Sequence, residues 1–388
     1  MEGDGAAPDR PGAGSRTLRE LSGAFADLGT FLPLVLGAVL VSGLDATGVL
    51  VGFGGFAIAV AVIYRRPVPV QPMKAVAAIA IAGALTPGTV AAAGLLIGLS
   101  LTVLALCGAL ERAARVVPQS VLAGVQVGIG LTLALHGLEL MGESAYLGAV
   151  CLVLLLALLR TAAAGVAALL LLAGATAWSI ATGAPLAWAG SLGELSLPAL
   201  VLPTTTELAT AAERTLLPQL PLTLANAVLA TAAIAATLFP DGSRSITPRR
   251  LGLTSGVLNV ILAPMGALPM CHGAGGLVTQ HRFGARTGLA PLIFGATCLA
   301  LGLLFGPRAT EALSIIPLAA LGALLTFAGL DLVATRRLFD GRPRCLAVIL
   351  ATAVVAVVTN AAYGLVVGLA LELGWTATQR ALQLRARP

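Results

Sequence analysis

A run of alternating prolines leads into the only lysine of the chain. Residues 65–74 read RRPVPVQPMK, and the apolar stretch AVAAIAIAGAL follows. Prolines at alternate positions cannot lie inside a helix and favour an extended chain, whereas proline is tolerated in a first helical turn. We therefore expect a helix that begins near Pro72 and carries Lys74 in its first turn. A charged amine within an apolar segment is costly and usually functional.

A second segment, residues 269–276, begins in a similar way with the sequence PMCHGAGG. Its glycines let the backbone approach a ligand closely, and His272 occupies the position equivalent to Lys74. Two half-helices, meaning helices that begin in the middle of the membrane, would each present unpaired N–H groups and roughly +0.5 of an elementary charge. Because such helix ends attract anions, the pair predicts an anion-binding site.

Further polar residues lie in the segments that should surround this site. Asp27 and Thr30 lie in the first apolar helix, and Thr223 and Asn226 share one face of a later helix. Asp27 could form an ion pair with Lys74, line the site or accept a coupling proton. Amide and hydroxyl donors suit an oxyanion, although hydrogen bonding between helices is an equal alternative.

Composition places these residues in a membrane protein. Of 388 residues, 58% are hydrophobic and 10% charged, whereas soluble domains are about 45–50% apolar and about 25% charged. The arginines lie in short connectors without interleaved aromatic residues, which argues against a nucleic-acid partner. The five cysteines show no metal-ligand spacing, and the motifs GxxxxGK[ST], HExxH and GxSxG are absent. We therefore predict no metal, no cofactor and no enzymatic activity.

Apolar runs between breaks predict fourteen segments, since a spanning helix needs about 20 apolar residues. If the N-terminus is cytoplasmic, twenty arginines lie inside and only Arg214 and Arg308 outside, as the positive-inside rule requires. Both termini are then cytoplasmic, and residues 1–19 are expected to be a disordered tail. The predicted segments are residues 20–42, 46–64, 71–85, 88–110, 118–136, 145–160, 163–183, 215–239, 249–268, 272–284, 287–306, 311–332, 345–359 and 361–379.

A weak internal repeat divides these segments into two sets of seven. Residues 96–108 resemble residues 294–306, and the pair Pro72-Met73 recurs as Pro269-Met270. Seven is an odd number, so the second repeat (205–379) must be inverted relative to the first (20–195). Inverted repeats with paired broken helices are typical of secondary transporters.

Four motifs in order resemble the molybdate transporter family, a branch of the sulfate-permease-like superfamily. They are ELSGAFADLGTFLPLVLG, PVPVQPMKAVAAIA, QLPLTLANAV and PMCHGAGGLVTQHRFGARTG. The resemblance implies a core (20–110 plus 215–306) that slides like an elevator past a gate (118–183 plus 311–379). It implies an anion held by Asp27, Thr30, Gln71, Met73, Lys74, Ala75, Thr223, Asn226, Cys271, His272, Gly273, Ala274, Gly275 and Gly276.

The sequence thus predicts a secondary transporter of molybdate in the cytoplasmic membrane, with the lipid bilayer as its surroundings. Tungstate, sulfate or bicarbonate on the same scaffold are alternatives, as is an anion channel or receptor. A nucleobase carrier is less favoured because it would normally need acidic side chains where this chain has Asn226 and His272. A homodimer is common in the superfamily, and nothing in the sequence decides it.

Overall fold

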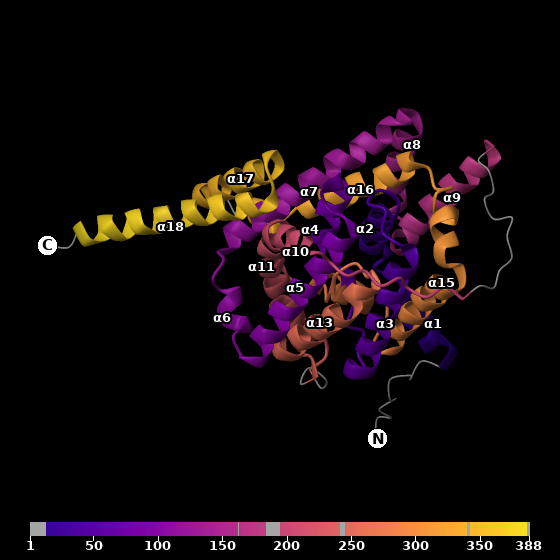
Figure 1. The fold of residues 1–388 in the computed structure, drawn as a ribbon, viewed down its shortest axis with the longest axis horizontal. Coiled ribbons are helices and arrows are strands. Elements are labelled where there is room, and N and C mark those ends of the chain that lie inside the picture. The colour runs from indigo at the N-terminus through magenta and orange to yellow at the C-terminus, as the bar shows by residue number, and fades with distance from the viewer. Residues whose placement is uncertain (1–12, 162, 184–194, 241–244, 340–341, 386–388) are drawn as a thin grey trace, which may run out of the picture.

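Helices make up nearly all of the secondary structure in the computed structural model (Figure 1), as predicted. The structure describes residues 13–161, 163–183, 195–240, 245–339 and 342–385. Its elements in the first half are α1 (Ala13–Ala24), α2 (Leu28–Leu40), α3 (Ala46–Tyr64), β1 (Gln71–Pro72), α4 (Lys74–Ile79), η1 (Ala80–Ala84), α5 (Pro87–Leu106), α6 (Leu110–Ala114), α7 (Gln119–Gly142), α8 (Ala145–Leu158), η2 (Ala164–Val166) and α9 (Ala167–Ala181).

The second half has the same kinds of element. They are α10 (Thr205–Ala211), η3 (Ala212–Leu216), α11 (Leu217–Leu222), η4 (Thr223–Ala230), α12 (Thr231–Leu238), α13 (Pro248–Leu262), η6 (Ala263–Met265), β2 (Met270–Cys271), α14 (Ala274–Arg282), α15 (Leu289–Leu313), α16 (Leu318–Val333), η7 (Arg336–Phe339), α17 (Pro343–Val358) and α18 (Ala361–Arg385). Each of the fourteen predicted ranges overlaps a helical segment, and how many of these cross a membrane stays a prediction.

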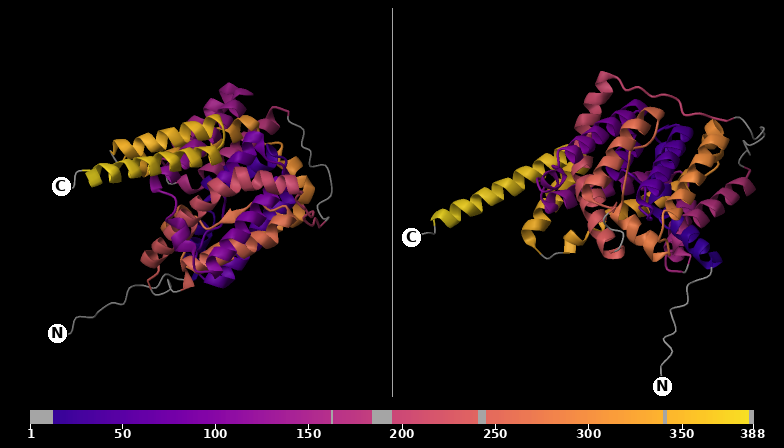
Figure 2. Two further views of the ribbon diagram at one scale, coloured as in Figure 1. Left: turned by 60° about the vertical axis from the view of Figure 1, so that its left-hand side comes forward. Right: turned by 90° about the horizontal axis from the view of Figure 1, so that it is seen from below.

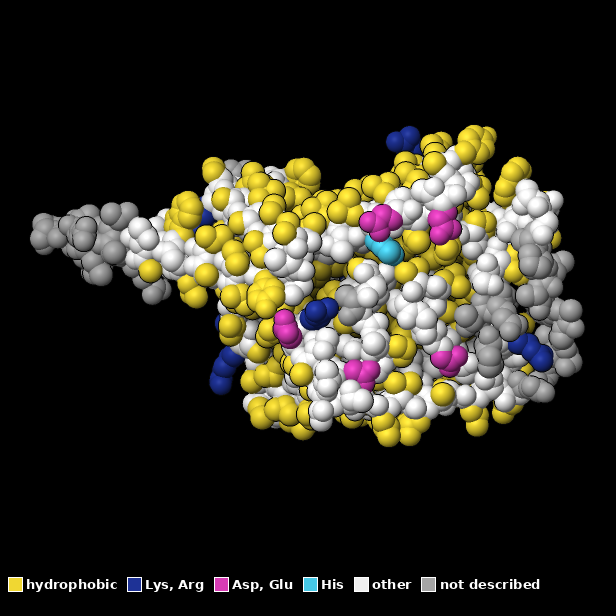
Figure 3. Space-filling view, turned by 45° about the horizontal axis from the view of Figure 1, so that its top comes forward, with side chains coloured by type: hydrophobic (Ala, Val, Ile, Leu, Met, Phe, Trp, Pro, Cys, Tyr) yellow, Lys and Arg dark blue, Asp and Glu magenta, His cyan; other side chains and the backbone are white. Residues whose placement is uncertain are grey.

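Several helices have the length and composition that a membrane span needs. Five in the described part of the chain pass that test, and a sixth counts if α1 and α2 form one bent span. Large apolar side chains also lie on the outside: Val153 is 67% exposed and Val354 60%. Figure 3 shows one face covered mainly by hydrophobic and uncharged groups, with few charged ones. Such a surface favours lipid over water.

The first predicted helix differs from the structure in two ways. The helix is broken after Ala24, and the pieces α1 and α2 meet at an angle of 42° with Asp27 at the start of α2. The predicted disordered tail is also too long, because α1 already begins at Ala13; residues 1–12 lie outside the described part. Glu20 holds α1 in place: its Oε1 accepts from the backbone N–H groups of Arg286 and Thr287, both at 3.0 Å.

The helix that corresponds to the eighth predicted segment (215–239) begins about ten residues earlier in the structure than predicted. The helical run α10–η3–α11–η4–α12 begins at Thr205 and continues to Leu238. Thr204 and Glu207 form a capping box at its start, in which each side chain binds the other's backbone N–H. A capping box is a recognised signal for the start of a helix. The prediction missed it because it lies among polar residues before the apolar run. Two π-helical stretches, η3 and η4, flank the short α11 that carries Pro218 and Pro221.

Helix packing follows the pattern expected of two intertwined repeats (Figure 1). Helix α3 packs along α15, α5 along α13 and α7 along α16. In the order of the predicted segments, these pairs are segments 2 and 11, segments 4 and 9, and segments 5 and 12. Each segment of the first repeat corresponds to the one seven places later. The first two pairs are therefore equivalent to each other, and the third pair is equivalent to itself. Small residues allow close approach of lipid-embedded helices, and a glycine pair lies at each interface: Gly54 with Gly295, Gly98 with Gly256, and Gly137 with Gly322.

The C-terminal helices lie at one end of the molecule. Helix α17 packs against α18 and α7. Helix α18 extends well beyond the rest of the chain (Figures 1 and 2). It continues past the predicted end of the last segment at residue 379 to Arg385.

Candidate functional site

A two-stranded crossing brings the two half-helix starts together. Strand β1 pairs with β2 in antiparallel register, with Gln71 opposite Cys271 and Pro72 opposite Met270. The N–H of Met73 also donates to the carbonyl of Pro269 at 2.8 Å. Helix α4 begins two residues after β1, and α14 begins three residues after β2. Because the strands are antiparallel, the chain leaves the crossing in opposite directions on its way into the two helices.

Asn259 of α13 fixes the second strand in place. Its Oδ1 accepts from the N–H of Met270 at 2.8 Å, and its Nδ2 donates to the Met270 carbonyl at 2.6 Å. The side chain is fully buried. A strand of two residues has few partners of its own, so this amide supplies the hydrogen bonds that a longer sheet would provide.

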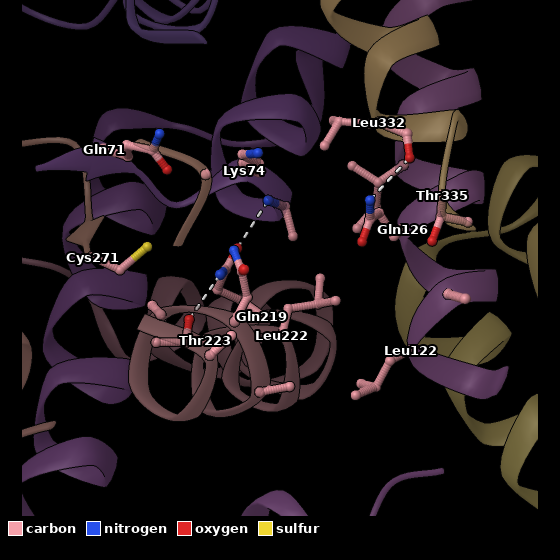
Figure 4. Close-up of a pocket in the computed structure, with 18 of the residues that line it drawn as sticks. Gln71, Lys74, Leu122, Gln126, Gln219, Leu222, Thr223, Cys271, Leu332 and Thr335 are labelled. Carbon is pink, nitrogen blue, oxygen red and sulfur yellow. Dashed lines mark hydrogen bonds between the residues drawn. The ribbon is translucent and has the colours of Figure 1, made fainter. Parts of the chain in front are cut away.

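Two cavities lie near this crossing. The larger of the two has a volume of about 400 Å³. One wall comes from β1, α4, α11, η4 and the start of α14, and the other from α7, the end of α16 and η7. Figure 4 shows Lys74, Gln219, Thr223 and Cys271 on one side, with Gln126, Leu332 and Thr335 facing them. The cavity has room for several waters, since a water occupies about 30 Å³ in the liquid.

The charges around the larger cavity favour a negative guest. Its lining includes two cationic side chains, Lys74 and Arg337, on opposite walls. No aspartate or glutamate is among its lining residues, all of which are described. Neutral hydrogen-bonding groups complete the lining, namely the side chains of Gln71, Gln119, Gln126, Gln219, Thr223, Asn226 and Thr335. Positive charge at the lining of a cavity attracts anions.

Lys74 also reaches a second, smaller cavity of about 200 Å³. This cavity contains Asp27 and Thr30 from one side and Asp331 of α16 from another. The Asp27 carboxylate accepts a hydrogen bond from Nε2 of Gln71. Asp27 and Lys74 therefore line one cavity without forming the direct ion pair that was one of the sequence alternatives, and both residues lie within the described chain.

The glycines of the second half-helix make room for the Asp27–Gln71 pair. A Cβ atom on Gly273 would lie 1.6 Å from Oε1 of Gln71, and one on Gly276 would lie 2.6 Å from Oδ2 of Asp27. Both distances are far below contact distance, so a larger residue at either position would force the Gln71 or Asp27 side chain to move. A Cβ on Gly275, in contrast, would meet no atom within 4 Å. The glycine run thus lets the side chains of Asp27 and Gln71 lie directly against the start of α14.

The amide end of α4 has an acceptor that the sequence did not indicate. The N–H of Ala75 donates to Oε1 of Gln219 at 2.8 Å, and the N–H of Val76 lies 3.4 Å from the same oxygen. Nε2 of Gln219 donates in turn to the hydroxyl of Thr223 at 2.9 Å. At the other half-helix, no side chain among the described residues accepts from the N–H groups of Ala274, Gly275 or Gly276.

His272 points away from both cavities. Its Nε2 lies 2.9 Å from the hydroxyl of Thr254, and its Nδ1 lies 3.2 Å from the carbonyl of Pro69. The ring packs edge-on against Phe56 and Tyr64, and the side chain is fully buried. In this arrangement the histidine ties β2 to α3 and α13, and a direct contact between its ring and a guest in either cavity would require the ring to move.

The structure divides the predicted binding residues into three groups. Those that line the larger cavity are Gln71, Lys74, Ala75, Thr223, Asn226, Cys271 and Gly275. Asp27 and Thr30 line the smaller one together with Lys74. Met73, His272, Gly273, Ala274 and Gly276 line neither, although Gly273 and Gly276 contact the Gln71 side chain. No group of three or more His, Cys, Asp or Glu that could hold a metal ion occurs among the described residues.

Sequence reasoning missed five lining residues with polar side chains: Gln119, Gln126, Gln219, Thr335 and Arg337. The only signal for Gln219 was its position between Pro218 and Pro221, in a motif already noted for Thr223 and Asn226. Gln126 lies within an apolar run, where a polar side chain most often bonds to a neighbouring helix, and its Nε2 does donate to the carbonyl of Leu332 at 3.0 Å. Thr335 and Arg337 lie in a connector whose arginines looked like topology signals alone.

Comparison with known sequences gives a consistent family. The family described as "Molybdate transporter of MFS superfamily" matches residues 19–133 and 211–332, which include both half-helices and most of the residues around the cavities. Molybdate transporter 2 of Arabidopsis thaliana is 32% identical over 410 residues, covering 91% of this chain and 86% of that protein. Molybdate transporter 1 of Chlamydomonas reinhardtii is 30% identical over 470 residues, covering 91% and 90%.

Solved structures share the fold at low sequence identity. The transmembrane domain of the cyanobacterium bicarbonate transporter BicA has a TM-score of 0.64 and 18% identity, covering 89% of this chain and 96% of that one. The murine Solute Carrier 26 family member A9 anion transporter in the inward-facing state has a TM-score of 0.66 and 14% identity, covering 98% and 74%. These likenesses show that the chain shares the fold of these two structures.

Proposed function

We propose that this chain, which belongs to the molybdate transporter family, is a secondary active transporter that carries molybdate across a membrane. The observation that carries the proposal is the larger cavity at the meeting point of two half-helix starts. Its lining has two cationic side chains, several neutral donors and no acidic side chain. This combination suits a small dianion that must be taken out of water.

Each binding group would contribute in a different way. The start of α14 reaches the cavity through Gly275, whose N–H has no side-chain acceptor among the described residues, so it can donate to an oxyanion oxygen. Lys74 would supply a full positive charge, and Asn226 an amide at the cavity surface. The side chain of Gln71 would help to shape the site while it holds Asp27. Hydrogen bonds to charged groups are worth about 1.5–3 kcal/mol each, so a few such contacts account for useful affinity.

The position of the cavity supports transport by an elevator-like movement. Its two walls come from different parts of the fold: the half-helices with α11 and η4, and α7 with α16. We assign the first wall to a substrate-carrying core (residues 20–110 plus 215–306) and the second to a gate (118–183 plus 311–379). Sliding of the core past the gate would move a bound anion from one side of the membrane to the other.

We further propose the cytoplasmic membrane as the location, with both termini in the cytoplasm. The support is the arginine distribution, with twenty arginines on the inner side and two on the outer. An epitope tag after Pro388 should be protected from added protease in intact cells and be cleaved in inverted membrane vesicles. Cleavage of the tag in intact cells would contradict the orientation.

Binding and flux measurements on the purified protein test the proposed activity. We expect calorimetry to show saturable binding of molybdate, with competition by tungstate because its size and charge are nearly the same. Proteoliposomes should take up labelled molybdate at a saturable rate. Tighter binding of sulfate or bicarbonate than of molybdate would show that the tighter-binding anion is the substrate. Flux that rises linearly without saturation would indicate a channel. Absence of binding by any of these anions would refute the proposal.

A further inference from the structure

The side chain of Gln219 occupies the amide end of the first half-helix. Helix α4 and η1 form one helical segment, Lys74–Gly83. In the first turn of this segment the N–H of Ala75 donates to Oε1 of Gln219. A backbone N–H can only donate, so the atom that faces it must be the oxygen of the amide. The hydroxyl of Thr223 accepts from the other end of the same amide, which fixes the orientation of the side chain.

This oxygen lies where an oxyanion oxygen would be expected to bind. Both are acceptors for the same N–H groups, and Gln219 and Ala75 line the larger cavity together. The side chain is only 3% exposed, so its hydrogen bonds form away from bulk water, where they are stronger than at a surface. The second half-helix differs, because its first N–H groups receive no side-chain acceptor among the described residues. The two halves of the site are therefore chemically unequal.

We propose that Gln219 is an internal cap of the substrate site, which satisfies the amide end of α4 when no anion is bound and gives way when one binds. The proposal rests on the transport function proposed above. An anion at α4 must displace the amide oxygen, so the cap lowers affinity. The displaced side chain can turn its NH₂ group toward the anion, because an amide carries both a donor and an acceptor.

The cap has a consequence for the transport cycle. Unsatisfied N–H groups are costly in surroundings without water. The substrate-carrying core could cross the membrane without an anion more easily if the Gln219 side chain satisfies the N–H groups of α4. With Gln219 the carrier can return without an anion and so perform net transport. Without that side chain the core would cross mainly when an anion is bound, and the protein would perform exchange.

The local structure around Gln219 is suited to such a change. Pro218 and Pro221 remove two backbone donors from the short helix α11, and π-helical stretches lie on both sides of it. Local π-helical turns are frequent at functional sites. Within the described part of the chain, the side chain hydrogen-bonds only to the start of α4 and to the hydroxyl of Thr223. Its release therefore breaks few hydrogen bonds.

Two substitutions of Gln219 test the cap, because they change molybdate affinity in opposite directions. Gln219→Ala should bind molybdate about 3- to 10-fold more tightly in calorimetry, since one displaced hydrogen bond corresponds to that range. In Gln219→Glu, a carboxylate caps the same N–H groups more strongly and repels the dianion, so binding should fall by at least about 10-fold. A merely structural role for Gln219 would lower affinity in both variants.

Flux in proteoliposomes tests the consequence for the cycle. We expect Gln219→Ala to lose most net uptake into liposomes without internal molybdate, while it keeps molybdate–molybdate exchange into preloaded liposomes. Gln379→Ala is the matched control, because this glutamine lies outside the lining of both cavities and accepts from Arg344; its ratio of net uptake to exchange should equal that of the unmodified protein.

Weaker binding in Gln219→Ala would overturn the cap, because it would make Gln219 a ligand. An equal loss of net uptake and of exchange in Gln219→Ala would also overturn the cap. If the unmodified protein neither binds nor transports molybdate, the proposed function itself fails. That result is visible before any variant is compared, so the two failures are distinguishable.

Discussion

Replacing Lys74 with methionine should lower the rate of molybdate uptake by about 10- to 100-fold. Methionine keeps the length of the side chain and removes its charge. Lys74 is the only lysine in the chain, lies in the first turn of α4 and lines both cavities. Loss of one charge-assisted hydrogen bond costs about 1.5–3 kcal/mol, and each 1.4 kcal/mol is a factor of about ten. Uptake of labelled molybdate into proteoliposomes measures the effect.

Two further variants separate the charge of Lys74 from other causes. Lys74→Arg retains the charge and should retain more uptake than Lys74→Met. Arg115→Ala removes an exposed positive charge outside the cavity lining, so its uptake should match that of the unmodified protein. Equal uptake by Lys74→Met and the unmodified protein, at equal amounts of folded protein, would remove Lys74 from the mechanism.

Replacing Gly273 with alanine should weaken molybdate binding by at least about 10-fold and lower the thermal unfolding temperature. The new Cβ would lie 1.6 Å from Oε1 and 2.2 Å from Cδ of Gln71, so the buried amide would have to leave its position. The hydrogen bond from Gln71 to Asp27 would then break. A buried polar group without its partner costs about 1–3 kcal/mol. Calorimetric binding and thermal unfolding in detergent report the two effects.

Gly275→Ala provides the matched control for this loss of stability. No atom lies within 4 Å of a Cβ at Gly275, and alanine is a better helix former than glycine by about 0.5–1 kcal/mol. The unfolding temperature should therefore stay the same or rise. Because Gly275 lines the larger cavity, its new methyl group should still weaken molybdate binding. Native stability and native affinity in Gly273→Ala would show that the Gln71–Asp27 pair is dispensable.

The sequence predicted the half-helices from local chemistry. Alternating prolines before Lys74 and glycines after His272 mark two breaks in otherwise apolar runs, and the structure has a strand and then a short helix at each break. The missed early start at Thr205 has a local cause as well, because the Thr204–Glu207 capping box lies in a polar stretch that hydropathy assigns to a connector. Signals of this kind act over a few residues, so they can be read without the fold.

The partners of the polar side chains could not be predicted in the same way. Asp27 was a candidate partner for Lys74, yet it accepts a hydrogen bond from Gln71. His272 matched Lys74 by position in the repeat, yet its ring lies between Thr254 and Pro69. Gln219 reaches the start of a helix 144 residues away in the chain. Each outcome depends on how one helix is rotated against another, and periodicity does not specify that rotation.

By itself, the sequence determined which segments are apolar, where two of them break and that the only lysine lies at the first break. These properties follow from hydrophobicity, backbone restriction and charge, all of which belong to single residues or short runs. Only the tertiary structure decided which side chains face the cavity and which cap or support the helix ends. Those choices depend on packing between distant helices, because a turn of a few tens of degrees moves a polar group from the cavity to a partner.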